Sequence, residues 1–309
     1  MKLSLFDLHC DTAYEMQRRG QPLTKNNLAV SLGNAEKFTK YVQVMAIWTD
    51  HNLSDEEGWS AFENILQHLQ NDPAVRCGDA RIVTAHPDVL DVPTLLLGVE
   101  DARILADRIE RVDALWDAGV RILTPLWKGM TSIGGSHDTD KGLTAFGRAA
   151  LERAVDLGMI LDISHASVAS ADEILEISRQ VGRPVIASHS NSHTVCPVSR
   201  NLSDRQVAQI IESGGVIGLN LYGAFLKSDG NATAKDIIPH IAHFLSLGAE
   251  NALCLGCDMD GCTLPPDIPS LDALPRLADA LLATGYSESL IRKLFFGNAE
   301  RFAKTYLTL

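Results

Sequence analysis

Two apolar segments that each end in a histidine constrain the fold of this chain most strongly. They read MILDISH at 159–165 and PVIASHS at 184–190, and residues 166–181 between them have the pattern of an amphipathic helix. Runs this rich in Ile, Val, Leu and Ala are typical of buried parallel strands. A strand, a helix and a second strand form a βαβ unit, whose strands are parallel. His165 and His189 are therefore expected at the carboxyl ends of neighbouring strands, where α/β proteins place their chemistry.

The same alternation extends over the rest of the chain. Apolar segments with the length of strands occur at 3–12, 41–47, 93–99, 121–127, 159–165, 184–190, 216–222 and 252–257. Eight strands with mostly helical connections predict an α/β protein with a (β/α)8 TIM barrel. A doubly wound open sheet is the alternative, but its nucleotide-binding versions lose support because neither glycine-rich phosphate-binding motif occurs. No linker or internal repeat divides the chain, so a single barrel domain over 1–309 with C-terminal helices is expected.

Capping residues indicate where several helices begin. Ser54, followed by Glu57, has the capping-box pattern for a helix over 55–69, and Ser203 is expected to cap a helix that runs to Ser213. Further helices are expected at 102–118, 144–157, 234–247, 271–283 and 287–306. Residues 13–40 are predicted to form a long loop with helical pieces. The Gly- and Ser-rich loop 128–142 is long for a compact domain, which indicates a functional or mobile segment.

The net negative charge of the sequence argues against two classes of binding partner. The net charge is −12, whereas nucleic acids and anionic membranes require basic surface, so neither is expected as a partner. No apolar run reaches the length of a membrane span, and the N-terminus enters a motif without the apolar region of a signal peptide, so a cytoplasmic protein is expected. The six cysteines are scattered, as reduced thiols are. Cys254 and Cys257 lie in an apolar strand and are expected to pack as small hydrophobic side chains.

Further polar residues end other predicted strands. His9 and Asp11 lie two residues apart at the end of the first strand, so both are expected to point to one side. Glu100 ends the third strand and Asp258 ends the eighth. A buried carboxylate needs a cation or a hydrogen-bond partner, although Glu100 has the alternative role of capping the helix that follows it.

Together with His165 and His189, these groups would face one cavity at the mouth of the barrel. Three imidazoles and two or three carboxylates exceed the ligand set of one tetrahedral zinc ion. They suit two ions bridged by a carboxylate, an arrangement that activates water for hydrolysis. The alternative for the two histidines is hydrogen bonding at the strand ends. Asp162 is expected to support the core or to orient a ligand histidine, and Asp260 to be a loop-side partner.

The remaining histidines are less strongly indicated as residues of the site. His137 and His193 lie in loops on the mouth side and are candidates for approaching a substrate. The others are expected to be surface or packing residues: His51, His68, His86, His240 and His243.

The order of these motifs resembles the membrane dipeptidase (renal dipeptidase) family of the amidohydrolase superfamily, in its bacterial branch. The matching segments cover nearly the whole chain: DLHCDT, GVED, LDISH, IASHSN, SRNLSD, GVIGLNLYG, GCDMDG and FGNAERF. The resemblance implies a barrel with two zinc ions per chain and removal of the C-terminal residue of a dipeptide by a hydroxide that bridges the metals. It also implies tolerance of a D residue at that C-terminal position and, because members are commonly homodimers, a homodimer.

The resemblance further implies a role for each metal-site residue. His9 and Asp11 would bind one zinc, His165 and His189 would bind the other, and Glu100 would bridge both.

Substrate-side roles follow in the same way. Asp258 would be the acid/base beside the bridging hydroxide, and Arg200 would hold the free carboxylate of the substrate, with Tyr222 lining the same pocket. For Arg200, a surface ion pair with Asp204 is the alternative. Trp127 stands where the animal members have a histidine. An indole N–H can donate one hydrogen bond but cannot carry a proton, which affects transition-state stabilisation and substrate range.

We therefore expect a zinc-dependent dipeptidase whose substrate is a small dipeptide. His137 is a candidate to enter the site in place of the missing histidine. One alternative is another amidohydrolase that acts on a lactam, an ester or an N-acyl amino acid with the same metal site. A further alternative is a metal-binding protein without catalysis.

Overall fold

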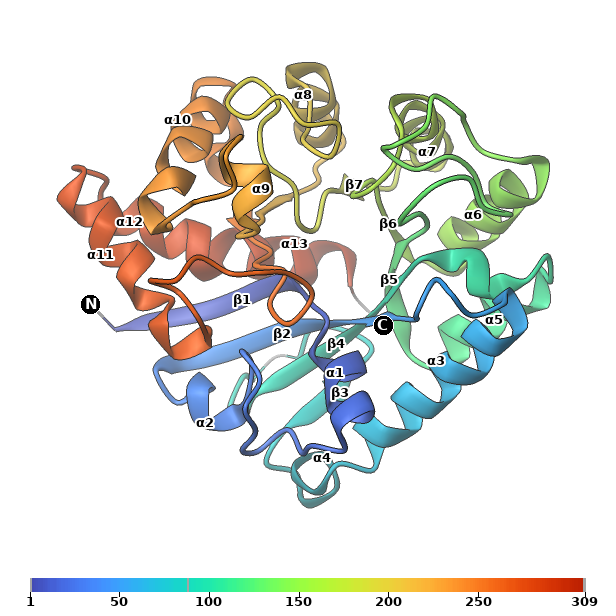
Figure 1. Ribbon diagram of the computed structural model, residues 1–309, viewed down its shortest axis with the longest axis horizontal. Helices are drawn as coiled ribbons and strands as arrows, with labels where there is room; N and C mark the ends of the chain where they lie inside the picture. The colour runs from blue at the N-terminus through green and yellow to red at the C-terminus, as the bar shows by residue number, and fades with distance from the viewer. Residues whose placement is uncertain (1, 88, 308–309) are drawn as a thin grey trace.

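Eight parallel strands form a nearly closed barrel in the computed structural model, which describes residues 2–87 and 89–307 (Figure 1). The barrel strands are β1 (Leu3–Cys10), β2 (Phe38–Trp48), β4 (Thr94–Glu100), β5 (Val120–Thr124), β6 (Ile160–Asp162), β7 (Val185–Ile186), β8 (Ile217–Leu219) and β9 (Leu253–Leu255). They pair in the order β7-β6-β5-β4-β2-β1-β9-β8. The predicted (β/α)8 architecture is confirmed. The predicted domain over 1–309 includes residues 1, 88, 308 and 309, which lie outside the described residues.

The two ends of this order meet through backbone hydrogen bonds just beyond β7. The Ala187 nitrogen donates to the Val216 carbonyl over 3.0 Å, and the Gly218 nitrogen donates to the Ala187 carbonyl over 2.8 Å. A further short strand, β3 (Arg81–Val83), pairs with the beginning of β4 and was not expected from the sequence.

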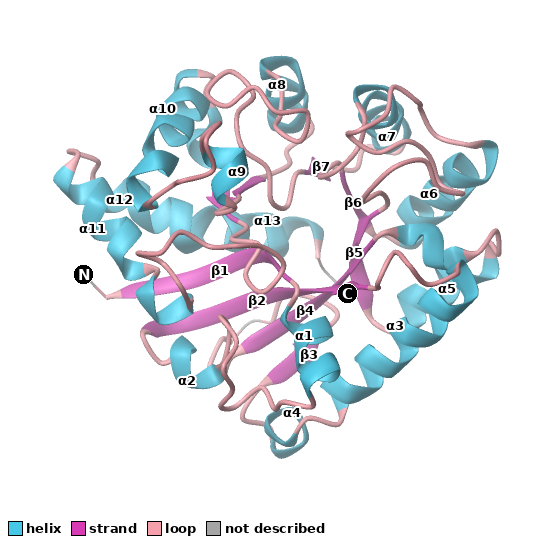
Figure 2. Ribbon diagram, viewed as in Figure 1, coloured by secondary structure: helices cyan, strands magenta, loops and turns pink. Residues whose placement is uncertain are grey.

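Helices surround the strands on the outside (Figure 2). Those between β1 and β5 are α1 (Thr12–Arg19), α2 (Leu32–Ala35), α3 (Asp55–Gln70), α4 (Pro73–Cys77), η1 (Ala102–Leu105) and α5 (Glu110–Asp117). Those up to β9 are α6 (Ala145–Leu157), α7 (Val168–Gln180), α8 (Asp204–Glu212), α9 (Gly223–Leu226), η2 (Ala234–Ile237), α10 (Ile238–Ser246) and η3 (Ala249–Asn251). The last are η4 (Leu271–Ala273), α11 (Pro275–Ala283), α12 (Glu288–Arg292), η5 (Lys293–Gly297) and α13 (Asn298–Tyr306).

Both predicted capping residues are confirmed, whereas several predicted bounds were wrong. Ser54 forms a capping box at α3, and Ser203 forms one at α8. The first strand ends at Cys10 and not at Thr12, because α1 begins at Thr12. The helices α1 and α2 agree with the helical pieces expected within residues 13–40. The predicted helix 102–118 is divided, because Ala106 and Asp107 adopt positive φ angles of 51° and 56° that end η1.

The inside of the barrel is filled by one layer of apolar side chains and capped by the last helix. Each barrel strand or its edge contributes to this layer: Phe6, Leu8, Val42, Val44, Leu96, Ile122, Ile160, Ile186, Val216 and Cys254. Ala299, Phe302 and Ala303 from α13 pack against it. The opposite strand faces pack on the surrounding helices in a larger cluster. The alternation of side chains along the strands therefore separates an inner from an outer core.

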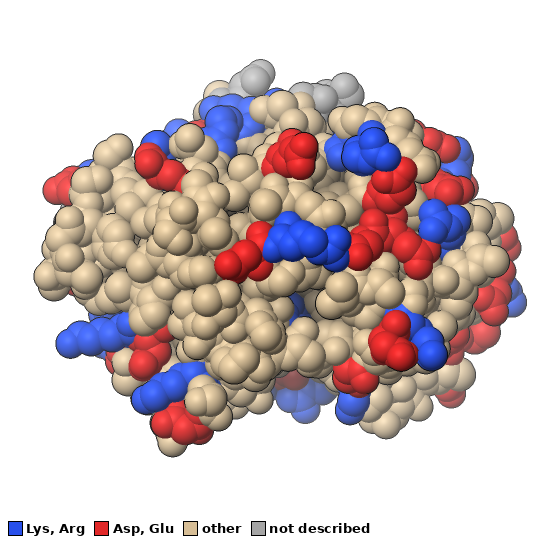
Figure 3. Space-filling model, turned by 90° about the horizontal axis from the view of Figure 1, so that it is seen from above, with Lys and Arg blue, Asp and Glu red and all other residues tan. Residues whose placement is uncertain are grey.

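Charged side chains of both signs are interspersed on the face shown in Figure 3. No helix in the described part of the chain has the length and apolar character needed to cross a bilayer.

Two glycines permit the closure between β7, β8 and β9. A Cβ on Gly218 would lie 1.8 Å from the Ser188 carbonyl oxygen, and a Cβ on Gly256 would lie 1.7 Å from the same atom. No real Cβ contact is this short, so the Ser188 backbone can sit between the two strands only because both positions lack a side chain.

Gly218→Ala is therefore expected to lower the free energy of unfolding by about 1–3 kcal/mol, the usual effect of overpacking. Urea denaturation would measure it. Gly33→Ala is the control, because its Cβ would meet nothing closer than the Thr24 carbonyl oxygen at 3.6 Å. Equal stability of the two variants would contradict the closure argument.

Candidate active site

A β-bulge turns His9 toward the barrel mouth. Along β1, Asp7 pairs with Gln43 of β2, but Cys10 pairs with Met45, so one residue of β1 is extra. The shift reverses the alternation, as bulges do: Cys10 packs in the outer core, and His9 joins the mouth. The buried Asp7 carboxylate accepts a hydrogen bond from the His9 nitrogen at 3.0 Å and another from the Gln43 side chain at 3.1 Å.

Glu100 lies at the centre of the site. It ends β4 in the same alternation as Leu96 and is 3% exposed. Its Oε1 lies 3.1 Å from His165 Nε2 and 3.3 Å from His189 Nε2, whereas its Oε2 lies 3.8 Å from His9 Nε2. The two carboxylate oxygens thus face two different sets of side chains.

His165 and His189 are fixed by the groups around their second ring nitrogens. Nδ1 of His165 lies 3.0 Å from the Trp127 carbonyl oxygen, and Nδ1 of His189 lies 2.7 Å from Ser188 Oγ. Both contacts leave Nε2 to face Glu100, and the two Nε2 atoms are 3.0 Å apart. His165 also has a positive φ of 68°, which turns it out of the path of β6.

A buried polar layer beneath these histidines supports them. Asp162 accepts hydrogen bonds from Thr124 Oγ1 at 2.7 Å, from the Ser164 and Ser188 nitrogens at 2.8 and 2.9 Å, and from Ser188 Oγ. Because Ser188 Oγ also contacts His189, Asp162 orients that histidine through Ser188. Of the two roles expected for Asp162, the structure shows this one.

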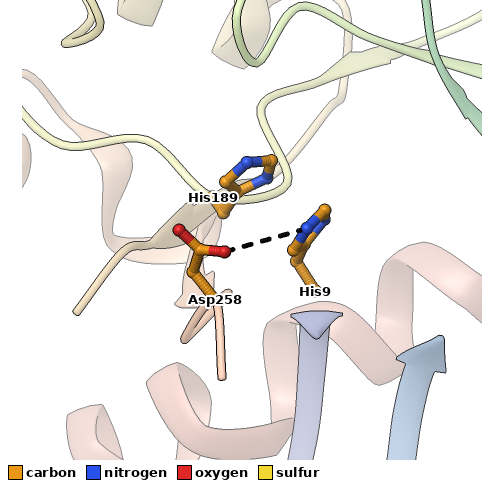
Figure 4. Close-up of side chains that lie close together, drawn as sticks. All are labelled: His9, His189 and Asp258. Atoms are coloured by element: carbon orange, nitrogen blue, oxygen red, sulfur yellow. Dashed lines mark ion pairs between the residues drawn. The ribbon is translucent and has the colours of Figure 1, made fainter. Parts of the chain in front are cut away.

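Asp11 and Asp258 complete the cluster on the β1–β9 side. Asp11 lies just beyond β1 as the N-cap of α1, and its Oδ2 is 3.4 Å from His9 Nε2. Asp258 Oδ1 is 4.0 Å from the same nitrogen (Figure 4), and its Oδ2 accepts a hydrogen bond from Asn220 Nδ2 at 3.0 Å. Gly261 permits this approach, since a Cβ there would lie 2.0 Å from Asp11 Oδ2.

The ionisation of these groups reflects an excess of buried negative charge. Burial raises the pKa of Glu100 well above its usual range, and burial together with the charge of Asp11 raises the pKa of Asp258 to about 7. Burial alone would lower the pKa of His9, but the charges of Glu100 and Asp11 raise it to about 10. Burial lowers the pKa values of His165 and His189, which keeps both imidazoles neutral.

These residues fit metal ions. Three groups bring ligand atoms within 4.8 Å of one another: His9 with Asp11 and Glu100, Glu100 with His165 and His189, and His9 with His189 and Asp258. Two buried atoms at their centre, His9 Nε2 and Glu100 Oε1, have no hydrogen-bond partner among the described residues. Divalent cations would satisfy both atoms and offset the excess of negative charge.

A cavity of about 910 Å³ opens above the cluster. Asp11, Glu100, His165 and Asp258 form its floor, and the predicted pocket residues Trp127 and Tyr222 line it, as does the candidate His137. The nitrogen of His137 donates to the His165 carbonyl oxygen over 2.7 Å, which holds the loop 128–142 against the site.

Arg200 is buried close to the cavity, with its guanidinium carbon 5.6 Å from the ring of Phe225, which lines the cavity. It is 4% exposed and does not belong to the cavity lining. Its guanidinium donates to Ser190 Oγ over 2.7 Å and to the His189 carbonyl oxygen over 3.0 Å. The alternative of an ion pair with Asp204 is wrong, because Asp204 Oδ1 lies 2.7 Å from His243 Nε2 instead.

Other residues named from the sequence lie outside the cluster. Cys254 and Cys257 are buried in the inner and outer cores, and all six cysteines are free. Asp260, the expected loop-side partner, accepts hydrogen bonds from Thr12 Oγ1 at 2.6 Å and from the Ala29 nitrogen at 2.7 Å. His240 is a packing residue, as expected, with its Nδ1 against the Ser192 nitrogen.

Sequence reasoning missed several supporting residues: Asp7, Gln43, Ser188, Asn220 and Gly261. Each lies within two residues of a predicted functional residue or pairs with its strand. Nevertheless, their contacts depend on the register of neighbouring strands. The pattern of residues along a single strand does not show that register.

Comparisons with known proteins agree with this geometry. A family model described as membrane dipeptidase, peptidase family M19, matches residues 1–307. An uncharacterized protein in the pqqA 5′ region of Klebsiella pneumoniae is 35% identical over 205 residues, 62% of this chain and 74% of that protein. A second, in the PQQ-III 3′ region of Acinetobacter calcoaceticus, is 33% identical over 211 residues, 63% of this chain and 66% of that protein.

Two solved structures are similar over the described barrel. A metallopeptidase from Rhodobacter sphaeroides, liganded with a phosphinate mimic of the dipeptide L-Ala-D-Ala, is 26% identical with a TM-score of 0.90, covering 99% of this chain and 100% of that one. A metallopeptidase of family M19 described as dipeptidase AC is 26% identical with a TM-score of 0.91, covering 99% of each chain. The whole-chain family match and these structures agree with the clustered histidines and carboxylates: the chain belongs to the membrane dipeptidase family, peptidase family M19.

Proposed function

We propose that this metallopeptidase hydrolyses dipeptides with two zinc ions held by the side chains at the barrel mouth. His9 and Asp11 would hold one ion, His165 and His189 the other, and Glu100 would bridge them. The position of Glu100 supports this assignment, because each of its oxygens faces a different pair of ligands. Three of these five side chains are imidazoles, which bind zinc in their neutral form, and two are carboxylates, a donor set that zinc accepts.

Two zinc ions at such a centre supply activated water at neutral pH and polarisation of the scissile carbonyl. The contacts of Asp258 support a role for it in moving the proton that this reaction requires. Asn220 holds Asp258 Oδ2, while Oδ1 faces the cluster beside His9. We propose that Asp258 accepts a proton from the attacking water and gives it to the leaving amine, as a general base and then a general acid.

The observation that carries the dipeptidase assignment is the buried guanidinium of Arg200. No carboxylate among the described residues forms an ion pair with it, and its Nε is buried without a hydrogen-bond partner. A buried charge of this kind needs a counter-ion. We propose that the free carboxylate of the dipeptide supplies it, approaching over Phe225, whose ring lies 5.6 Å from the guanidinium carbon, and beside Tyr222.

The related metallopeptidase from Rhodobacter sphaeroides binds a mimic of a dipeptide with a C-terminal D residue. This supports the proposal that the present chain tolerates a D residue at the same position. Trp127 borders the cavity beside His165, with ring centroids 6.4 Å apart, and we propose that it contacts the substrate without taking part in proton transfer.

Several expectations stay predictions: the homodimer, the cytoplasmic location and the single domain. Zinc analysis together with hydrolysis of a panel of L-L and L-D dipeptides tests the proposed function directly. An absence of bound metal would overturn the proposal together with the amidohydrolase alternatives, which use the same metal site. A metal-loaded protein that hydrolyses no dipeptide would favour the lactam, ester or N-acyl alternatives.

Glu100→Gln is expected to lower the zinc content from about two ions per chain, the count that a two-metal mechanism uses. The amide keeps the shape but removes the charge that both sites share. Metal analysis after dialysis would measure this, with Glu110→Gln, an exposed glutamate on α5, as the control. Full zinc content and activity in Glu100→Gln would exclude the bridging role.

Asp258→Asn is expected to lower kcat by about 10²–10⁴, the range for loss of general acid–base catalysis. Zinc should stay bound, because the five proposed ligands are intact. Steady-state kinetics with metal analysis of the same sample would measure both quantities. Activity within a few-fold of the wild type would assign the proton transfer to another residue.

Arg200→Met is expected to lower kcat/KM, with a loss of transition-state stabilisation of about 2–4 kcal/mol, the usual loss when one partner of a buried charge pair is removed. Amidating the C-terminus of the dipeptide should cost the wild type a similar amount.

Combined, the two changes should cost much less than their sum, because both remove one interaction. Strictly additive losses would show that Arg200 does not bind the carboxylate, and would favour the alternative amidohydrolase activities.

A further inference from the structure

Three aromatic side chains from different elements form a continuous wall in the cavity. Tyr14 comes from α1, Trp48 from the end of β2 and Trp127 from the loop after β5. The rings of Tyr14 and Trp48 meet edge to face with centroids 4.9 Å apart, and those of Trp48 and Trp127 do so at 5.1 Å. All three line the same cavity as the metal cluster.

The wall and Arg200 belong to different parts of the barrel mouth. Trp127 lies beside His165, Trp48 contacts Trp127, and Tyr14 contacts Trp48. These residues belong to the β1–β5 half of the barrel, whereas Arg200 and Tyr222 follow β7 and β8. On the proposed function, a dipeptide with its carboxylate near Arg200 extends its N-terminal residue toward the wall.

The carboxylate of Asp50 belongs to the same cavity lining as this wall. Asp50 lines the cavity, and its Oδ1 accepts hydrogen bonds from the nitrogen and Nδ2 of Asn52 at 2.9 and 2.8 Å. These hydrogen bonds lower the pKa of Asp50, which keeps it ionised. The ring of the next residue, His51, lies against Trp127 with centroids 5.2 Å apart, which places this segment beside the wall.

Asp50 has no cationic partner of its own. Among the described residues, no lysine or arginine forms an ion pair with its carboxylate, and the only such contact is to His51 Nδ1 at 3.7 Å. The neighbouring carboxylate Glu15, by contrast, is held by both Arg18 and Arg19. The wall therefore combines electron-rich ring faces with a carboxylate that forms no direct ion pair with a lysine or arginine of the described residues, although Arg103 donates to the Asp50 carbonyl oxygen over 2.8 Å.

We infer that the wall formed by Tyr14, Trp48 and Trp127, with Asp50, is a specificity subsite for a basic side chain on the N-terminal residue of the dipeptide. The methylene groups of lysine or arginine would lie along the indole rings, and the charged end would reach Asp50. This inference rests on the proposed dipeptidase function and adds the class of substrate.

The test compares kcat/KM of the zinc enzyme for L-Lys-D-Ala, L-Arg-D-Ala, L-Glu-D-Ala, L-Phe-D-Ala and L-Ala-D-Ala. The two basic dipeptides should be the best substrates and L-Glu-D-Ala the poorest. Asp50→Asn should reduce the ratio of L-Lys-D-Ala to L-Glu-D-Ala by about three- to ten-fold, the range for a partly exposed charge pair. Asp50→Lys should reverse the ratio.

Two further variants distinguish a contact between the substrate and the aromatic wall from a general effect of charge on the substrate ratios. Trp48→Leu should lower the ratio of L-Lys-D-Ala to L-Ala-D-Ala by about three- to thirty-fold, the range of cation–π contacts. Asp279→Asn is the control: it removes the same charge from an exposed position on α11, outside the cavity lining. Its substrate ratios should equal those of the wild type.

Dissociation constants for phosphinate mimics of L-Lys-D-Ala and L-Glu-D-Ala, measured by calorimetry, provide a readout besides turnover and should follow the same ratios. Dipeptide hydrolysis without a basic preference, or with a preference that Asp50→Asn retains, would overturn the inference and leave the proposed function standing. L-Phe-D-Ala as the best substrate would overturn the basic class. If no dipeptide is hydrolysed, the proposed function fails and the inference falls with it.

Discussion

The site depends on one buried carboxylate with neighbours on both sides. Glu100 is placed by the regular alternation of β4 in the barrel mouth, and each of its oxygens faces a different set of imidazoles and carboxylates. A charge held there without water is unstable unless cations compensate it. Of the three histidines around Glu100, burial keeps His165 and His189 neutral, so His9 and bound cations would supply the compensating positive charge.

The remainder of the barrel mouth holds these groups in place. Asp7 stabilises the bulge that turns His9 inward, and Asp162 holds His189 through Ser188. Both carboxylates belong to buried hydrogen-bonded networks, whose members depend on one another. The side chains inside the barrel below the site are apolar, so the polar side chains of the site lie directly above a hydrophobic core.

Much of this arrangement could be predicted from the sequence, and the limits have physical causes. The strands were recognisable because buried parallel strands are continuously apolar, and Glu100 was placed correctly because β4 is regular. For His9, the expectation that it shares one strand face with Asp11 was wrong in its reason: a bulge turns His9, and Asp11 lies beyond the strand as a helix cap. The burial of Arg200 and the grouping of Trp48 with Asp50 could not be predicted, because both depend on contacts between distant elements.

The packing of α13 has a consequence for how the chain reaches its native state. Side chains near the end of the sequence, such as Phe302, fill the same interior as Phe6 and Leu8 near its beginning. Contacts between residues this far apart in sequence slow folding, since a long loop must close before they can form. During synthesis on the ribosome, the inner face of β1 has no partner from α13 until residues 298–306 have emerged, and over that interval its apolar side chains are open to chaperones and to aggregation.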